Sequence, residues 1–257
     1  MAELEYLYGS MELGKTSSYA SQVITVQTAE WAPGIWAGLE GAALDIWDST
    51  LATQRATGVV ISSVDIDART ITITGTYSSS ASGDRIFLAG AKGNEMAGIH
   101  KILSNTGSIF GIDAASYSLW KGTSYSAGSA ALSQAKIGAA IAKAVAKGLN
   151  DELMLMVNVN AWNNLLNDQA ALKRFSDSSK KISGPVFVNG AEAIEFYSQN
   201  GVCKIVPSIY VKEGYAFGLC VSDWLRVGAT DITMKTPGVG EQIFFHLPTK
   251  AKVLAVA

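Results

Sequence analysis

The feature that most limits the possible folds is a run of alternating residues over 58–90, GVVISSVDIDARTITITGTYSSSASGDRIFLAG. In the TITIT of residues 70–74, an extended backbone places the threonines on one face and the isoleucines on the other. A two-residue period bounded by turn residues is typical of half-buried strands. We therefore predict a small β module over 58–90, with a hairpin turn at Asp67-Ala68 and a further strand in RIFLAG.

The residues before this module predict an extended segment and then a helix. QVITVQT, 22–28, is β-branched and alternating, and Pro33 closes it. In GIWAGLEGAALDIWDSTLATQ, apolar residues recur at helical spacing, which predicts a helix over 34–53. Gly38 and Gly41 weaken that helix intrinsically, so packing has to hold it.

The clearest helical stripe follows Ser133, a suitable N-cap residue. The stripe has apolar side chains four positions apart: Ile137, Ile141, Val145 and Leu149. Gly148 predicts the end of this helix. The apolar run LMLMV, 153–157, is typical of a strand covered on both faces, and AWNNLLNDQAALKRF predicts a second helix. Residues 133–175 are therefore predicted to form a helix–strand–helix unit. Hairpins at Asn189-Gly190 and Asn200-Gly201 and a strand in YAFGLCV follow it. Residues 90–132 are predicted to be mostly loop with short strands.

One motif points to nucleotide chemistry. GSMELGKT, Gly9 to Thr16, has the spacing of a phosphate-binding loop, which would make Gly9, Gly14, Lys15 and Thr16 the nucleotide ligands. Such a loop needs a helix that begins at its Lys-Thr and directs a positive N-terminus at the phosphates. TSSYASQVITVQ predicts loop and strand instead, and Glu12 places a carboxylate within the motif. We interpret the two glycines as bends of an extended arm and Lys15 as an exposed contact, and a nucleotide hydrolase stays as an alternative.

Other residue patterns give no catalytic, cofactor-binding or metal site. The chain has only two histidines, His100 in GIHKIL and His246 in FFHLP, and both are interpreted as structural. Cys203 and Cys220 lie in apolar stretches without C-x-x-C spacing, so buried free thiols and an origin in a reducing cytosol are expected. We expect no enzyme activity, no cofactor and no metal.

Charge is scarce in this chain. Charged residues make up 16% of the 257 positions, against roughly 25% in an average soluble domain, and the net charge is −2. This balance argues against sequence-independent nucleic-acid binding, and no apolar run reaches the length of a membrane span. The chain either buries one large core or is a soluble subunit whose surface is covered by neighbours, and we favour the second. Trp31, Trp36 and Trp47 are, with Lys15, the predicted subunit contacts.

The order of the parts resembles the major capsid proteins of tailed bacteriophages. QTAEWAPGIWAGLEGAALDIWDS is similar to the segment that leads into the family's spine helix, and ALSQAKIGAAIAKAVAKGLNDELMLMVNVNAWNNLLND to its helix, buried strand and aromatic-led helix. IVPSIYVKEGYAFGLCVSDWLRVGA resembles the closing strands. AGAKGNEMAGIHKIL and GIDAASYSLWKG resemble the glycine-containing segment between them, which carries these matching residues: Gly111, Ile112, Asp113, Tyr117, Leu119 and Trp120.

The resemblance implies a virion protein, assembled in the host cytoplasm, whose hexamers and pentamers close into an icosahedral head around double-stranded DNA. Scaffolding, portal and decoration proteins would be its partners, without a membrane and without sequence-specific DNA contacts. An encapsulin-like compartment shell of the same fold is a further alternative. The implied α+β fold divides into an N-terminal arm and extended loop (1–33), a spine helix (34–57), a β insertion (58–90), the rest of the peripheral lobe (91–132), an axial lobe (133–230) and a C-terminal return (231–257).

Overall fold

The computed structural model describes residues 7–10, 12–94, 98–104, 107–167, 194–198, 201–224, 244–246 and 252–254. The chain is a mixed α+β protein with several sheets and short helices. It divides into two units, Met1–Val221 and Ser222–Ala257. The second unit contains an antiparallel pair, β13 (Phe244–His246) and β14 (Lys252–Leu254). The other sheets and the helices α2 to α5 lie in the first unit.

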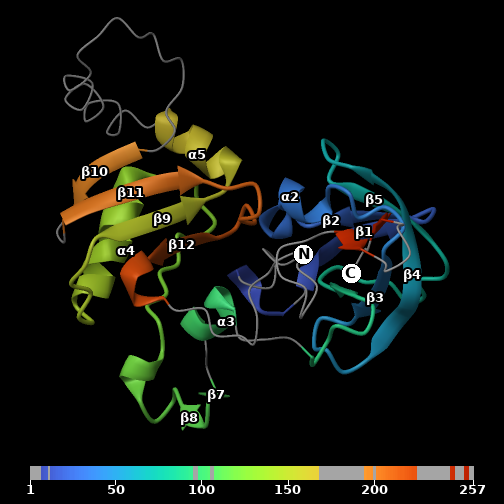
Figure 1. The fold of residues 1–257 in the computed structure, drawn as a ribbon, viewed down its shortest axis with the longest axis horizontal. Helices are drawn as coiled ribbons and strands as arrows, with labels where there is room; N and C mark the ends of the chain where they lie inside the picture. Colours follow the sequence, from blue (N-terminus) through green and yellow to red (C-terminus); the bar gives the residue numbers. More distant parts are fainter. Residues whose placement is uncertain are drawn as a thin grey trace, which may run out of the picture. The chain divides into compact units, whose positions relative to one another are not determined.

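Six antiparallel strands close into a barrel in the order β1-β2-β5-β4-β3-β6 (Figure 1). They are β1 (Glu12–Ala20), β2 (Val23–Val26), β3 (Ala43–Trp47), β4 (Gln54–Asp65), β5 (Thr70–Thr74) and β6 (Arg85–Leu88). The alternation in TITIT is confirmed, because Ile71 and Ile73 are fully buried in the barrel core. The predicted hairpin between β4 and β5 is also confirmed, with Asp65 paired to Thr70.

The helix predicted over 34–53 is wrong. Helix α2 contains only Pro33–Trp36, and ALDIW then forms β3. Gly38 and Gly41 both have positive φ, a backbone conformation that ends a helix. Leu44 and Ile46 are buried while their neighbours are only partly so, which is a strand period. A spine helix over 34–57 is therefore absent from the structure.

The barrel also corrects two segment boundaries. Residues 12–26 form β1 and β2, so this part of the predicted arm is built into a closed sheet rather than extended away from it. The β module is larger than the predicted 58–90, because β1, β2 and β3 complete the barrel. Pairing of β6 with both β1 and β3 closes the circle.

The helix–strand–helix prediction is confirmed over the described residues. Helix α4 (Gln134–Val145) follows Ser133, β9 (Leu153–Val157) is the LMLMV strand, and α5 (Val159–Leu166) matches the first part of the second predicted helix. Strands β10 (Ile194–Ser198), β11 (Gly201–Pro207) and β12 (Ala216–Leu219) complete a sheet in the order β10-β11-β9-β12. Only β9 and β11 run parallel. The predicted Asn189-Gly190 turn lies outside the described residues.

A second core lies within this α/β unit and joins α4 and α5 to the sheet. Its side chains are almost completely buried: Ile137, Ile141, Leu155, Val157, Trp162, Leu165, Cys203 and Ile205. The stripe read from the sequence thus gives the inward face of α4. None of the helices in the described part of the chain is long and apolar enough to cross a membrane.

The segment between barrel and α/β unit has little regular structure, as predicted. Its described elements are helix α3 (Ile99–Leu103), the pair β7 (Ser108–Ile109) and β8 (Ile112–Asp113), and the turn η2 (Ser118–Trp120). His100 lies in α3.

Candidate functional site

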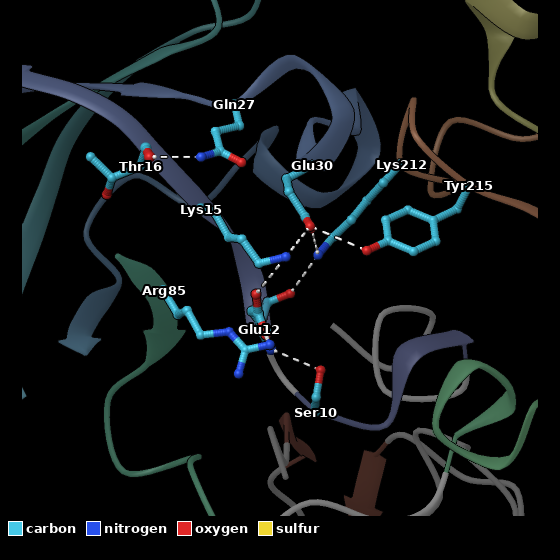
Figure 2. A network of polar contacts seen from close by, with 9 residues as sticks. All are labelled: Ser10, Glu12, Lys15, Thr16, Gln27, Glu30, Arg85, Lys212 and Tyr215. Atoms are coloured by element: carbon cyan, nitrogen blue, oxygen red, sulfur yellow. Dashed lines mark hydrogen bonds and ion pairs between the residues drawn. The ribbon is translucent and has the colours of Figure 1, made fainter. Parts of the chain in front are cut away.

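A buried ionic network forms where four separate elements meet (Figure 2). Strand β1 supplies Glu12 and Lys15, the short turn η1 (Thr28–Glu30) supplies Glu30, and β6 supplies Arg85. The loop between β11 and β12 supplies Lys212 and Tyr215, far along the chain from the others. The site therefore exists only in the folded protein.

Glu30 is the centre of the network. Its carboxylate accepts hydrogen bonds from Lys15 Nζ at 2.5 Å, Lys212 Nζ at 2.9 Å and the Tyr215 hydroxyl at 3.2 Å. The side chain of Glu30 is 6% exposed and that of Lys212 is 3% exposed. Burial alone would raise the pKa of Glu30, but the two ammonium groups outweigh it and hold the pKa at about 2. Glu30 is thus a stable carboxylate.

Glu12 lies beside this centre with weaker support. Its carboxylate is 3.2 Å from Arg85 Nη2 and 4.0 Å from Lys15 Nζ, and its backbone oxygen accepts a bond from Lys212 Nζ at 3.0 Å. Burial raises the pKa of Glu12 more than Lys212 and Arg85 lower it. The two glutamates of one network therefore have pKa values shifted in opposite directions.

Aromatic rings cover the network on one side. Tyr8, His100, Tyr215 and Phe217 contact one another, with ring centroids 5.1–6.4 Å apart. The ammonium of Lys212 lies 4.7 Å from the ring centre of Tyr8. Burial, followed by the charge of Lys212, lowers the pKa of His100, so this imidazole is kept neutral.

The phosphate-loop motif does not have phosphate-loop geometry. Gly14, Lys15 and Thr16 are consecutive residues of β1, which continues to Ala20, and no helix begins at Lys15. Thr16 is fully buried, and its hydroxyl accepts a hydrogen bond from Tyr77 at 3.4 Å. Lys15 is bound to Glu30 and its side chain is 27% exposed, so the freely exposed side chain that was predicted is wrong, while its subunit contact stays a prediction.

Burial corrects two of the three predicted tryptophan contacts, and the contact at Trp47 stays a prediction. Trp31 and Trp36 are 1% and 0% exposed and stack on each other, with ring centroids 5.5 Å apart. They belong to the barrel core, so neither presents a surface to a neighbour. Trp47 is partly buried, and Lys92 Nζ lies 3.2 Å from its ring centre.

Several chemistries can be judged from the described residues. Across them, no group of three or more His, Cys, Asp or Glu side chains could hold a metal ion. Cys203 and Cys220 are both buried, as predicted, and burial raises the pKa of Cys203 to about 11. The charged groups of the network pair with one another, so we interpret the network as structural. The sequence signal for it is slight: Lys212 is a single lysine after the mostly apolar run IVPSIYV.

A second candidate site is a surface, which we call the aromatic arm, residues 107–125. Phe110 and Gly111 form the two-residue turn between β7 and β8, and both have positive φ. Hydrogen bonds order the arm: Trp120 Nε1 donates to the Ile109 carbonyl, and Asp113 accepts from the amide of Ala115. The arm nevertheless exposes a set of large apolar side chains: Phe110, Ile112, Tyr117, Leu119, Trp120 and Tyr125.

No protein-family model, curated protein or solved structure matches the chain. The function has to be inferred from the geometry of the two sites and from the order of sequence elements.

Proposed function

We propose that this chain is a structural subunit of a closed protein shell, the major capsid protein of a tailed bacteriophage. Its copies would form hexamers and pentamers that enclose double-stranded DNA, together with scaffolding, portal and decoration proteins. The observation that carries the proposal is the aromatic arm, which displays apolar side chains on an ordered framework.

The exposure within the arm is large for a monomer. Leu119 is 81% exposed, Phe110 77% and Tyr117 66%. Several large apolar side chains exposed within one short segment are typical of a protein–protein contact. Burying a side chain such as Phe or Leu stabilises a contact by about 1.5–3 kcal/mol, so a few arm residues are enough to join two subunits weakly and repeatedly.

The turn at Phe110 supports the same use. Positive φ at both central residues suits Asn-Gly or Gly-Gly, whereas a bulky residue in this conformation is strained by about 1–3 kcal/mol. Despite this cost, the turn places an aromatic ring at the tip of a hairpin, where it is 77% exposed. A ring kept in this position is accounted for if a neighbouring subunit receives it.

The sequence resemblance supports the identity of the shell. The stretch GIDAASYSLWKG, which resembles the capsid family, forms most of the aromatic arm. The helix, buried strand and aromatic-containing helix that follow it resemble the family's axial lobe, and the structure has these three elements in that order.

Assembly of the purified full chain tests the proposal, by sedimentation velocity and electron microscopy. The wild type is expected to form fast-sedimenting closed particles. The double variant Phe110→Lys/Leu119→Lys is expected to stay small, with an unchanged circular dichroism spectrum. Val159→Lys is the control, because it alters an exposed apolar residue on α5. A wild type that stays monomeric at high concentration, or an arm variant that assembles normally, would contradict the proposal.

The contents of the particles separate two kinds of shell. Double-stranded DNA inside particles from infected cells supports a viral head, whereas enzyme cargo without DNA supports an encapsulin-like compartment.

A further inference from the structure

The loop between β11 and β12, two strands of the α/β sheet, packs against the barrel. We call residues 208–215 the clasp. Val211 and Lys212 are buried at its centre, with exposed fractions of 0% and 2%. A connection between two strands ordinarily runs over the surface, so a loop with a buried lysine at its middle requires an explanation.

The clasp is bonded to the barrel by its backbone. Ile209 accepts a bond from the amide of Gly34 at 3.0 Å. The amides of Glu213 and Gly214 donate to the carbonyls of Trp31 and Ala29, at 3.0 and 2.8 Å. A Cβ on Gly214 would lie 2.8 Å from the Ala29 oxygen, so this approach requires glycine. The clasp thus fits closely against residues 29–34.

Charged side chains fasten the clasp at two further points. Lys212 reaches Glu30 and the backbone oxygen of Glu12, as Figure 2 shows. Arg69, in the turn between β4 and β5, lies 3.0 Å from the carboxylate of Glu213. The clasp therefore forms ion pairs with two separate segments, at Glu30 in η1 and at Arg69 in the turn between β4 and β5.

The α/β unit holds the same loop from its other side. Asn158 Nδ2 donates to the carbonyl of Val211 at 2.7 Å, and Asn160 Nδ2 donates to Glu213 at 2.8 Å. The amide of Ser208 donates to Val157 at 2.8 Å. Glu213 therefore binds the barrel through Arg69 and the α/β unit through Asn160 at once.

Apolar contacts also join the barrel and the α/β unit, but such contacts do little to fix one orientation. Val211, Phe217 and Leu219 belong to the barrel's own hydrophobic cluster. Hydrophobic burial is non-directional, and replacing a buried ion pair by apolar residues is often neutral for stability. Apolar contact can keep the barrel and the α/β unit together, whereas hydrogen bonds and ion pairs are needed to fix their angle.

We propose that the clasp is an orientation lock: the Glu30–Lys212 and Arg69–Glu213 pairs fix the barrel at one angle to the α/β unit. When these charges are removed, the barrel keeps its fold, its apolar contact and the backbone hydrogen bonds of the clasp, but its angle to the α/β unit varies more widely. This inference concerns the chain itself and does not depend on shell formation.

Distances between spin labels on the full chain test the lock. The labels are placed at Ser63→Cys on β4 and Ala139→Cys on α4, two exposed positions. Wild type without these substitutions is the labelling blank, because both native cysteines are buried. We expect one narrow distance distribution in the labelled parent. The double variant Glu30→Leu/Lys212→Met removes one charge of each sign, and we expect its distribution to broaden at least twofold while its circular dichroism spectrum is unchanged.

A control variant tests whether the loss of any ion pair, rather than of the clasp pairs, broadens the distance distribution. Arg55→Met breaks a pair that lies within the barrel, where Arg55 Nε is 3.2 Å from Asp84, and its distribution is expected to stay narrow. If the double variant fails to fold, Arg69→Glu decides: broadening is expected, with narrowing restored in Arg69→Glu/Glu213→Arg. An unchanged distribution in a folded lock variant, or equal broadening in Arg55→Met, would overturn the proposal.

Discussion

Packing requires a glycine at position 14, although the motif GSMELGKT suggests that Gly14 binds phosphate. A Cβ at Gly14 would lie 2.9 Å from Val26 Cγ1 and 3.2 Å from the ring of Trp36. Overpacking a core typically destabilises by about 1–3 kcal/mol. We expect Gly14→Ala to lower the free energy of unfolding by about 2 kcal/mol, measured by urea denaturation. Gly138→Ala is the matched control: its Cβ meets open space within α4, and alanine there should stabilise the chain by up to about 1 kcal/mol. Equal effects at the two glycines would refute the packing explanation.

At the scale of the element, two helices begin with good N-cap residues that are used differently. Asn158 accepts a bond from the amide of Asn160 and donates another to Val211, whereas the Ser133 side chain makes no cap bond to α4. Losing a cap destabilises by about 1 kcal/mol, and a buried acceptor left unpaired adds about 1–3 kcal/mol. We expect Asn158→Ala to lower the free energy of unfolding by about 3 kcal/mol and Ser133→Ala by under about 0.5 kcal/mol. Thermal unfolding of both variants checks this, and a Ser133→Ala loss as large as that of Asn158→Ala would contradict it.

Elements whose signal is local were predictable from the sequence. The stripe of α4, the run of β9 and the alternation of β5 each read correctly, because neighbouring residues alone set which face is buried. The helix predicted over 34–53 was wrong because the apolar spacing there fits both a helix and a turn followed by a strand. Two glycines at positive φ and the pairing of β3 with β4 and β6 decide for the strand. Tertiary pairing of this kind overrides a local propensity.

For the whole molecule, the parts that could not be predicted are those made by distant residues. Closure of the barrel depends on β6 pairing with both β1 and β3. The ionic network depends on Lys212 reaching Glu30, 182 positions away in the chain. No residue period or motif predicts contacts between such distant residues. Apart from the single lysine after IVPSIYV, the sequence did not indicate that Glu30, Arg85 and Lys212 share a site. The aromatic arm was visible as the stretch GIDAASYSLWKG, but its exposure was not.

The network also gives the whole molecule a defined response to acid. The pKa of Glu30 is lowered from 4.5 to about 2 by Lys212 and Lys15 against the effect of burial. A folded-state pKa below the unfolded one stabilises the protein fully above pH 4.5, and this stability is lost as the pH falls towards 2. The shift corresponds to about 3 kcal/mol. Glu12 has the opposite effect on stability. Its pKa is raised, so ionisation of its carboxyl group destabilises the folded protein as the pH rises above 4.5.

Urea denaturation between pH 2 and 7 measures both effects. Wild type should lose stability steeply below pH 4.5. Glu30→Leu/Lys212→Met should lose the part of that slope that comes from Glu30 and keep the part that comes from shared carboxyls with lowered pKa, such as Asp48 and Asp113. Glu12→Gln should keep the acid slope and be at least as stable as wild type at pH 7, since it removes a charge whose burial is unfavourable. A double variant with the full wild-type slope would show that Glu30 is not the group that titrates.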